Sequence, residues 1–357
     1  MLDNTIATLQ ADAVELLKRL IATPSFSKEE DKTADIIQTF LIDREVIINR
    51  EINNIWAQNL YFDPSKPTIL LNSHHDTVKP NTGYTLNPFQ PIVTDGKLYG
   101  LGSNDAGGAL VALISTFLYF YKNNTLKYNI IMAATAEEEI SGRNGVELIY
   151  KKFLPLDFAI VGEPTNMQLA IAEKGLLVLD CIAHGVSGHA AREVGDNAIY
   201  KAMKDIEWIR NYQFPKISDL LGPVKMSVTI INSGTQQHNV IPDTCTFTID
   251  IRVTDVYKNE DIVDIIKQHV SSEVVPRSIR LKPSSIDKAH PIVQAGVAMG
   301  KTTFASPTTS DQSLMDCPSL KIGPGDSSRS HTADEFIYIA EVQDAIADYI
   351  TMLKKII

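Results

Sequence analysis

Hydrophobic and polar positions follow two different periods along this chain. In some segments apolar residues recur at helical spacing, and in others they form short continuous runs that are typical of buried strands. We expect helices over residues 12–21, 29–42, 109–121 and 145–151, and strands near Ile47 and over residues 68–72, 129–134 and 158–161. Short, wholly apolar strands separated by helices predict a mainly parallel sheet with helices on both faces, which is an α/β fold.

The order of the predicted elements changes near residue 174. From there we expect strand 176–184, helix 196–212, strands 225–232 and 244–253, helix 258–271 and strand 277–282. This β-α-β-β-α-β order is that of the ferredoxin-like arrangement. After Pro283 the first pattern resumes, with helix 291–300, strand 319–322 and a terminal helix from about Ala340. The pattern therefore predicts a larger discontinuous domain, residues 1–173 and 284–357, with a smaller α+β domain, residues 174–283, inserted into it.

Composition excludes several classes of protein. The 357 residues include 43 acidic and 33 basic side chains, a net charge of −10, which disfavours nucleic acid and anionic membranes as partners. An apolar content of 44% is enough to form a large core. The uncharged stretch from Ala106 to Tyr121 is shorter than the roughly 20 residues of a membrane span. The N-terminal segment has no continuous apolar region typical of a secretory signal, so we expect a cytoplasmic protein.

The cysteine pattern limits the kinds of metal site that the chain can form. Cys181, Cys245 and Cys317 are far apart in the sequence, with no CxxC pair. This spacing indicates neither a disulfide framework nor a thiolate zinc site. Any metal must then be held by histidine and carboxylate side chains.

Four polar motifs follow predicted strands or begin a predicted helix. SHHDTV follows the strand TILLN, GLGSNDAGG begins the helix over 109–121, TAEEE follows the strand NIIMAA, and GEPT follows the strand FAIV. Ligands bind open α/β sheets just outside the carboxyl ends of the strands. We therefore expect the four motifs to meet in one crevice.

The first two motifs place a histidine and two aspartates in that crevice. His74 and Asp76 project to the same side of an extended strand, so the Asp76 carboxylate is placed to accept the second ring N–H of a metal-binding His74. The alternative is an ordinary polar strand end. Asp105 lies in a glycine-rich turn whose spacing is GxGxxxxG, not the GxGxxG of a dinucleotide loop. It is either a metal-bridging carboxylate or part of a structural helix entry.

The remaining motifs supply further carboxylates and a second histidine. Glu137, Glu138 and Glu139 repel one another unless a cation or a shared proton relieves the repulsion, although a solvated acidic loop is an alternative. Glu163 precedes a proline, which keeps it extended. His331 follows the strand SLKI, and an exposed loop histidine is its alternative interpretation. Thr332 and Glu335 have the spacing of a helix capping box.

Taken together, these motifs predict a site for two divalent ions. The candidate ligands are His74, Asp105, Glu139, Glu163 and His331. Two neighbouring ions need a shared ligand, and a carboxylate offers two oxygens that bridge them. Mixed nitrogen and oxygen ligands without thiolate suit zinc, cobalt or manganese.

The ordered set of motifs resembles the co-catalytic zinc metallopeptidase family that includes acetylornithine deacetylase, succinyl-diaminopimelate desuccinylase, glutamate carboxypeptidase and aminoacylase. The resemblance covers nearly the whole chain. It rests on HxD at His74, GxGSxD at Gly100–Asp105, EE at Glu138–Glu139, GEPT at Gly162–Thr165, GxxGHAA at Gly185–Ala191, and the terminal His331. The chain departs from the family pattern in having DAGGA after Asp105, without the usual lysine, and a glutamate at position 137 where aspartate is common.

The resemblance implies a role for each matching residue. His74 and Glu163 would hold one ion, Glu139 and His331 the other, and Asp105 would bridge the two. Asp76 would orient His74, and Glu138 would be the general base. His189, in the smaller domain, would reach the active site of a partner subunit, which makes the inserted domain a lid and dimerisation domain. Asn239 and Arg252 would contact the substrate, Arg252 through a carboxylate.

The resemblance also implies an activity, the hydrolysis of an N-acyl amino acid by a di-zinc homodimer. We expect N-acetyl- or N-succinyl-L-ornithine, in arginine biosynthesis, as the substrate. Alternatives in the same family are a dipeptidase, a carboxypeptidase or succinyl-diaminopimelate desuccinylase. Alternatives of other classes are a non-catalytic protein that keeps the fold and a nucleotide-dependent enzyme, the latter supported only by the glycine-rich turn.

Overall fold

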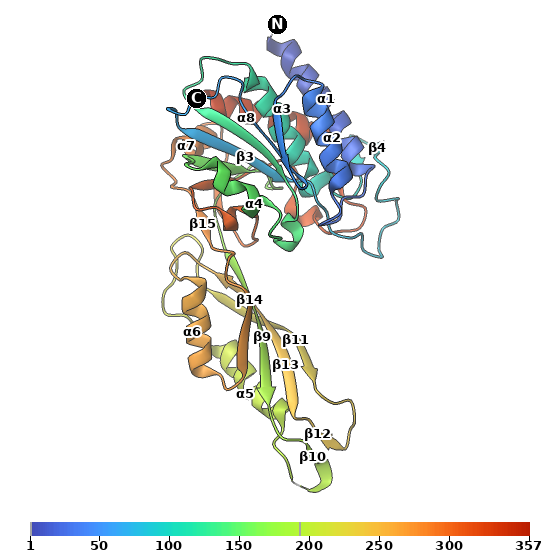
Figure 1. Cartoon of the computed structure of the whole chain (residues 1–357), viewed down its shortest axis with the longest axis vertical. Coiled ribbons are helices and arrows are strands. Elements are labelled where there is room, and N and C mark those ends of the chain that lie inside the picture. The colour runs from blue at the N-terminus through green and yellow to red at the C-terminus, as the bar shows by residue number, and fades with distance from the viewer. Residues whose placement is uncertain (1, 193) are drawn as a thin grey trace. The chain divides into compact units, whose positions relative to one another are not determined.

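The computed structural model describes residues 2–192 and 194–357, which form two compact units (Figure 1). Unit 1 contains the chain up to Ile171 together with Ser285–Phe304 and Ser310–Ile357. Unit 2 contains Ala172–Ser284 and the short segment Ala305–Thr309. The sequence pattern assigned that segment to the larger domain, but the Thr309 hydroxyl donates to the Lys174 carbonyl (3.1 Å) and Lys174 N–H donates to the Ser306 carbonyl (3.2 Å).

Unit 1 is built on a mixed sheet with a parallel centre. The strand order is β1 (Ile48–Glu51), β2 (Asn54–Gln58), β6 (Asn129–Thr135), β3 (Thr68–His74), β7 (Phe158–Val161), β17 (Ser319–Lys321), β8 (Leu169–Glu173) and β15 (Ser284–Ser285), and β16 (Thr303–Ser306) pairs with β8. The central strands β6, β3, β7 and β17 are parallel, whereas β2 and β8 join them antiparallel. The predicted α/β class is confirmed.

Helices cover both faces of this sheet because its central strands are apolar on both sides. Ile69 and Leu71 of β3 pack into the larger core with helices α1, α2, α3, α7 and α8, whereas Leu70 packs on the opposite face with α4. The helices of unit 1 are α1 (Leu2–Ile21), α2 (Asp31–Ile42), α3 (Gly108–Tyr121), α4 (Val146–Tyr150), α7 (Pro291–Val297) and α8 (Ile339–Lys354).

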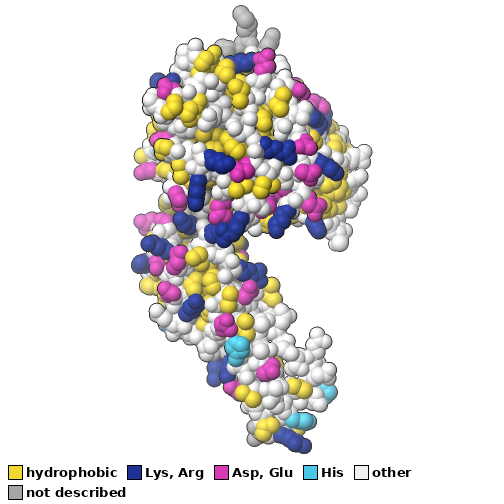
Figure 2. All heavy atoms as spheres, in the orientation of Figure 1, with side chains coloured by type: hydrophobic (Ala, Val, Ile, Leu, Met, Phe, Trp, Pro, Cys, Tyr) yellow, Lys and Arg dark blue, Asp and Glu magenta, His cyan; other side chains and the backbone are white. Residues whose placement is uncertain are grey.

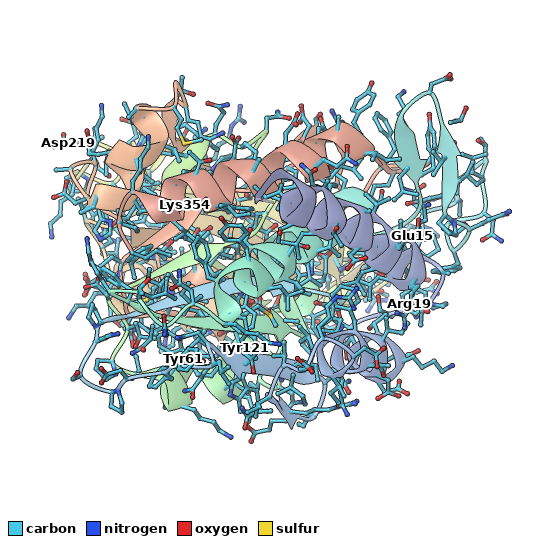
Figure 3. All side chains as sticks on the ribbon, turned by 90° about the horizontal axis from the view of Figure 1, so that it is seen from above. Glu15, Arg19, Tyr61, Tyr121, Asp219 and Lys354 are labelled. Carbon is cyan, nitrogen blue, oxygen red and sulfur yellow. The ribbon has the colours of Figure 1, made fainter. Side chains whose placement is uncertain are left out.

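Helix α3 is the uncharged stretch of the sequence, and its position explains its composition. It packs against both α1 and α8, which also contact each other and lie side by side in Figure 3. Glu15 and Arg19 lie on α1 and Lys354 on α8, and the Lys354 Nζ lies 4.7 Å from the ring centroid of Tyr119 on α3. α3, which carries no charged side chain, is therefore largely buried by these helices and by the sheet, and only Leu118 and Tyr119 are half-buried. A second, three-stranded sheet of unit 1 has the order β18 (Phe336–Tyr338), β5 (Lys97–Tyr99), β4 (Ile92–Thr94).

Unit 2 has the ferredoxin-like order that the sequence predicts. Its antiparallel sheet has the order β11 (Lys225–Ser233), β13 (Thr244–Val253), β9 (Gly175–His184), β14 (Glu273–Ser278), and a short ladder joins β10 (Gly188–His189) to β12 (Val240–Ile241). Helices α5 (Ala198–Asn211) and α6 (Asn259–His269) pack on one face of the sheet. Alternate residues of β9 are buried against them and the residues between are half-buried, as expected of a sheet with one covered face.

One strand prediction in unit 2 is wrong. The pattern predicted the last strand over 277–282, but β14 spans Glu273–Ser278 and contains Pro276. β14 lies at the edge of the sheet, where a proline lacking N–H is tolerated.

The surface of the described residues fits the composition. In the described part of the chain no helix has both the length and the apolar character that crossing a bilayer requires. On the face drawn in Figure 2 acidic and basic side chains are interspersed over each unit.

Candidate metal centre

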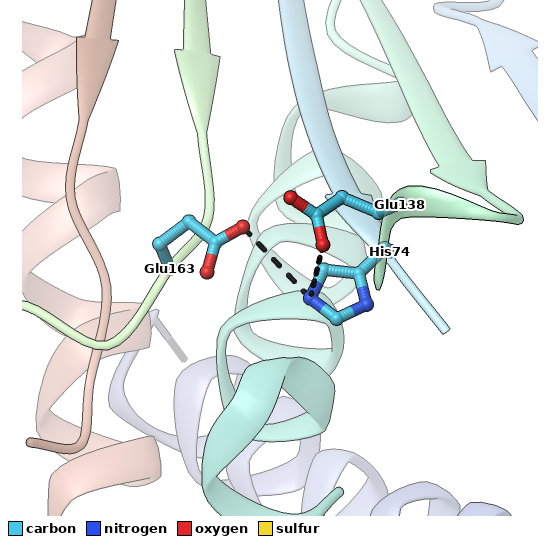
Figure 4. Close-up of side chains that lie close together, drawn as sticks. All are labelled: His74, Glu138 and Glu163. Carbon is cyan, nitrogen blue, oxygen red and sulfur yellow. Dashed lines mark ion pairs between the residues drawn. The ribbon is translucent and has the colours of Figure 1, made fainter. Parts of the chain in front are cut away.

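Three expected site residues lie at the carboxyl ends of neighbouring parallel strands in unit 1. His74 is the last residue of β3, Glu138 follows β6, and Glu163 follows β7, and these strands are adjacent in the order β6, β3, β7. Figure 4 shows the two carboxylates turned toward the His74 ring. The convergence of these motifs at one edge of the sheet follows from the parallel strand order.

The His74 ring has one nitrogen fixed by the backbone and the other directed at carboxylates. Its Nδ1 lies 3.0 Å from the Asp76 carbonyl oxygen and 3.4 Å from Asp76 Oδ1. Its Nε2 lies 3.4 Å from Asp105 Oδ1 and 3.8 Å from both Glu138 Oε2 and Glu163 Oε1. This Nε2 is buried and makes no hydrogen bond. An Nδ1–H that donates to Asp76 leaves the Nε2 lone pair free to bind a cation.

Asp105 connects His74 with the second histidine. Asp105 Oδ1 faces His74 Nε2, and Oδ2 lies 3.6 Å from His331 Nε2. The same His331 nitrogen lies 3.0 Å from Glu139 Oε2. Each oxygen of one carboxylate thus faces a different imidazole, which is the arrangement expected of a bridging ligand. The structure brings together all five side chains that the sequence grouped.

Asp76 contacts more than the histidine that it was expected to orient. Its carboxylate accepts the backbone N–H groups of Glu138 (3.0 Å) and Glu139 (3.2 Å) and the Ser27 hydroxyl (2.6 Å). The side chain is fully buried. Asp76 therefore fixes the turn that carries both glutamates as well as the ring of His74.

The crowded carboxylates shift one another's proton affinities. Burial and the neighbouring carboxylates raise the pKa of Glu138 well above its ordinary value, and burial raises that of Glu163 to about 8. Burial alone would lower the pKa of His74, but Glu138, Asp105, Asp76 and Glu163 together raise it well above its ordinary value. Without a metal, this cluster therefore holds protons that relieve the repulsion among its negative charges.

These residues fit divalent metal ions. Two sets, His74 with Glu138 and Glu163, and His74 with Asp105 and Glu139, each have ligand atoms within 4.8 Å of one another. The buried Nε2 of His74 points into both sets. Imidazole and carboxylate ligands without thiolate suit zinc, cobalt or manganese.

In metal-free protein, the free energy of unfolding is expected to fall as the pH rises from 7 to 9. The hydrogen bond with Glu139 raises the pKa of His331 to about 9, and burial raises that of Glu163 to about 8. Both values lie above the ordinary ones, so in this window the folded chain binds more protons than the unfolded chain, and losing them removes stability. Thermal melting in EDTA at pH 7, 8 and 9 measures this. A midpoint that stays constant or rises contradicts it.

Addition of zinc at pH 8 is expected to raise the melting midpoint that EDTA lowered, because the ions replace the protons that hold the ligands together. At pH 5 the same addition is expected to raise it less, because protons compete for the ligands. An equal zinc effect at both pH values would contradict metal binding by this cluster.

Three buried acids near the site were not singled out as functional by the sequence. Glu30 accepts the N–H of Glu137 (3.2 Å), and Asp311 accepts from Asn72 Nδ2 (2.8 Å) and Thr135 Oγ1 (2.7 Å) at the ends of β3 and β6. Glu335 accepts backbone N–H groups of the Asp105 turn instead of forming the capping box that its spacing suggested. Each contact joins segments far apart in sequence, so no local spacing indicates it.

The other expected functional residues lie in unit 2. His189 and Asn239 are neighbours there, because β10 pairs with β12 and the Ala190 N–H donates to the Asn239 carbonyl (3.0 Å). Arg252 lies near the opposite end of the unit 2 sheet, paired in register with Leu176, and its guanidinium donates to both carboxylate oxygens of Asp250 (2.8 and 3.1 Å). Unit 2 therefore presents two separate groups of the expected residues.

Comparisons with known proteins identify the family to which the chain is similar. A family model described as Peptidase family M20/M25/M40 matches residues 70–355. The succinyl-diaminopimelate desuccinylase of Rickettsia bellii (strain OSU 85-389) is 26% identical over 371 residues, which cover 94% of this chain and 95% of that protein. The enzyme of the same name from Wolbachia pipientis wMel is 28% identical over 270 residues, 71% of this chain and 66% of that protein.

The solved structures agree on the fold. A tripeptidase from Staphylococcus aureus subsp. aureus Mu50 matches with a TM-score of 0.79 at 19% identity, covering 97% of this chain and 98% of that one. The region that the family model matches contains all five candidate ligands, His74, Asp105, Glu139, Glu163 and His331.

Proposed function

The chain belongs to peptidase family M20/M25/M40, and from this premise we propose that it removes the succinyl group from an N-succinyl amino acid, with N-succinyl-diaminopimelate as the first candidate. Family membership supports the general statement, a metal-dependent hydrolase. The observation that carries the chemistry is Asp105, whose two oxygens face His74 and His331. The substrate is proposed from a relative that covers nearly the whole chain and is named succinyl-diaminopimelate desuccinylase.

The expected ornithine substrate is not supported. The two relatives described above are named succinyl-diaminopimelate desuccinylase, which the sequence analysis gave as an alternative activity. Neither is named acetylornithine deacetylase. The ordered metal-site motifs are shared by the whole family, so they identify the hydrolytic chemistry and leave the acyl amino acid open.

We propose that His74 and Glu163 hold one ion, that Glu139 and His331 hold the other, and that Asp105 bridges them. Zinc is the proposed metal, and cobalt and manganese suit the same ligands. When bound, such ions lower the pKa of water toward neutrality and polarise a carbonyl group. Asp76 keeps the His74 ring in place and holds the backbone of the Glu138 turn.

Glu138 is the proposed general base. Its carboxylate lies 3.8 Å from His74 Nε2, beside the proposed metal position. It accepts a proton from the water whose oxygen attacks the amide carbon, and it donates that proton to the amine nitrogen when the C–N bond breaks. The products are a carboxylate and a free amine.

His189 is proposed to act on the active site of a second copy of the chain. Its Nδ1 accepts the Ala191 N–H (3.1 Å), so the neutral ring carries its proton on Nε2, and that N–H is a donor for a developing oxyanion. The unit 2 sheet ends in an edge strand, β11, next to α5. Tyr200 and Met203 of α5 and Ile230 of β11 are exposed apolar side chains that a second copy would cover.

The variant His189→Ala is expected to lower kcat by about 10²- to 10³-fold, the usual effect of losing an oxyanion donor, without changing metal content. Mixing tests whether His189 acts across subunits. Refolded together in equal amounts, Glu138→Gln and His189→Ala chains form mixed dimers in which one site combines an intact Glu138 with the partner's intact His189. About half of the dimers are mixed and each has one working site out of two, so the mixture should regain about a quarter of wild-type activity. No recovery would place His189 in its own subunit's site or outside catalysis.

Two residues of unit 2 are proposed to bind the substrate. Arg252 is half-buried, and two hydrogen bonds to Asp250 hold its guanidinium in one orientation. We propose that its remaining N–H groups bind a carboxylate of the substrate. Asn239 lies beside the β10–β12 ladder that contains His189, and we propose that its amide contacts the acyl group.

The test of the proposed substrate is a direct comparison of hydrolysis rates. Purified protein with added zinc or cobalt is assayed on N-succinyl-diaminopimelate, N-acetyl-ornithine, N-succinyl-ornithine and a dipeptide panel, and the free amine is quantified. We expect the highest kcat/KM for the succinylated diaminopimelate. Turnover of dipeptides alone would show that the protein is a dipeptidase and contradict the proposed substrate. It would not contradict the proposed metal centre.

A further inference from the structure

Glu335 makes an unusual set of contacts next to the proposed metal centre. The side chain is buried, with 1% of its surface exposed. Its Oε1 accepts the backbone N–H groups of Asn104 (2.8 Å) and Asp105 (2.9 Å), and its Oε2 accepts that of Gly102 (3.2 Å). Its own backbone carbonyl accepts the N–H of Gly100 (2.9 Å). One residue therefore binds four backbone groups of the turn that carries Asp105.

These N–H groups have no alternative partner within their own segment. Residues 103–107 form an irregular turn before α3, in which Asp105 and Ala106 have non-helical backbone angles, so the N–H groups at the start of this turn lie outside a regular helical hydrogen-bond pattern. The turn is also closely packed: Gly102 has a φ of 76°, and a Cβ there would lie 2.6 Å from Thr77 Cγ2. The Glu335 carboxylate thus supplies the acceptors for the N–H groups of Gly102, Asn104 and Asp105 and fixes where the Asp105 side chain leaves the backbone.

Glu335 lies four residues after His331 in the same segment. The carboxylate therefore ties the segment that carries His331 to the turn that carries Asp105. Asn104 adds a second connection, because its Nδ2 donates to the Asp326 carbonyl (3.0 Å) and its Oδ1 accepts the Asp326 N–H (3.0 Å). The distance of 3.6 Å between Asp105 Oδ2 and His331 Nε2 is set by this junction between the two segments.

We propose that Glu335 is a positioning residue for the second metal ion, the one assigned to Asp105, Glu139 and His331. This inference rests on the proposed metal centre and adds a residue that touches neither ion. Shortening or neutralising Glu335 releases the Asp105 turn from the His331 segment. The affinity for the ion that both segments bind then falls. The affinity for the other ion, which His74 at the end of β3 and Glu163 after β7 hold, falls less.

A purely structural role for Glu335 predicts a different outcome. If the carboxylate only stabilised the fold, its loss would lower the melting midpoint but leave both ions with their original affinities. The discriminating measurement is therefore metal binding, site by site, in folded protein. Loss of a residue that supports a metal ligand typically weakens binding about 10- to 100-fold.

The experiment titrates metal-free protein with Co²⁺, following heat by calorimetry and the visible absorption of the bound ion. Glu335→Gln keeps the shape but replaces one acceptor oxygen with an amide NH₂ that opposes the Gly102 N–H. The matched control is Asp334→Asn, the neighbouring acid, whose carboxylate accepts the Thr85 and Leu86 N–H groups (2.8 and 2.9 Å) and none from residues 102–105.

We expect two ions in the wild type and in Asp334→Asn, and in Glu335→Gln a first ion of near wild-type affinity and a second bound about 10- to 100-fold more weakly, with an altered spectrum. Two wild-type affinities with an unchanged spectrum in Glu335→Gln would overturn the inference alone. Fewer than two ions in the wild type would overturn the proposed metal centre and the inference with it.

If Glu335→Gln does not fold, Glu335→Asp answers the same question. Aspartate keeps the charge and shortens the side chain by one methylene, so it cannot reach all three N–H groups at the present distances. A weakened second ion in this variant supports the positioning role, and two wild-type affinities contradict it.

Discussion

Replacing Glu138 by glutamine is expected to lower kcat by about 10²- to 10⁴-fold while two divalent ions remain bound. Glutamine keeps the size of the side chain but cannot accept the proton of the attacking water. The five proposed ligands are untouched, and the backbone N–H of residue 138 still donates to Asp76. Steady-state kinetics with metal analysis on the same preparation gives both results.

The control for this variant is Glu147→Gln. Glu147 is a partly exposed carboxylate on α4, whose Oε1 lies 3.8 Å from Arg143 Nη1. We expect its kcat and metal content to equal those of the wild type. Near wild-type turnover in Glu138→Gln would refute the general-base role. Loss of metal in that variant would show that Glu138 is itself a ligand, since it belongs to the possible ligand set of His74, Glu138 and Glu163.

Replacing Asp105 by alanine is expected to lower kcat/KM by at least about 10³-fold and to reduce metal content below two ions. A single electrostatic contact in a hydrolase site is worth about 10²- to 10³-fold in kcat. Asp105 faces both imidazoles, so its loss affects both proposed ions at once. Activity assays and metal analysis after dialysis measure the two effects.

The matched control is Asp95→Asn, which changes an exposed acid in the turn between β4 and β5. It should keep full activity and two ions. If Asp105→Ala retained both ions with wild-type affinity, Asp105 would not be the bridging ligand between the ion bound by His74 and the ion bound by His331.

The proposed metal ligands could be found from the sequence because each lies in or next to a recognisable motif. His74, Glu139 and Glu163 follow short apolar strands, and parallel strands bring their carboxyl ends to one edge. Asp105 and His331 come from a helix entry and a loop, and their grouping came from the donor chemistry and the ordered family motifs. The structure then supplies the distances that the sequence lacks.

The supporting acids could not be found in this way. Glu30 and Glu335 act on backbone N–H groups that lie 107 and more than 200 residues away in sequence. A backbone donor has no residue type, so a sequence pattern cannot show which carboxylate accepts from it. Only the folded chain brings the Glu335 carboxylate onto the Asp105 turn.

Two errors in the fold prediction also have tertiary causes. The helix predicted from residue 12 begins at Leu2, and Gln10 of its early part donates to the Gln343 carbonyl of α8 (2.8 Å). Packing against α8 therefore extends a segment whose own pattern is weakly helical. The edge position of β14 likewise admits Pro276, which local propensity places outside a strand.

The most direct test of the di-metal centre is anomalous X-ray diffraction from crystals grown with zinc. Two peaks are expected beside Asp105, one between its carboxylate, His74 and Glu163, and the other between its carboxylate, Glu139 and His331. A map without peaks in this cluster at saturating zinc, or with ions bound only elsewhere on the chain, would contradict the account.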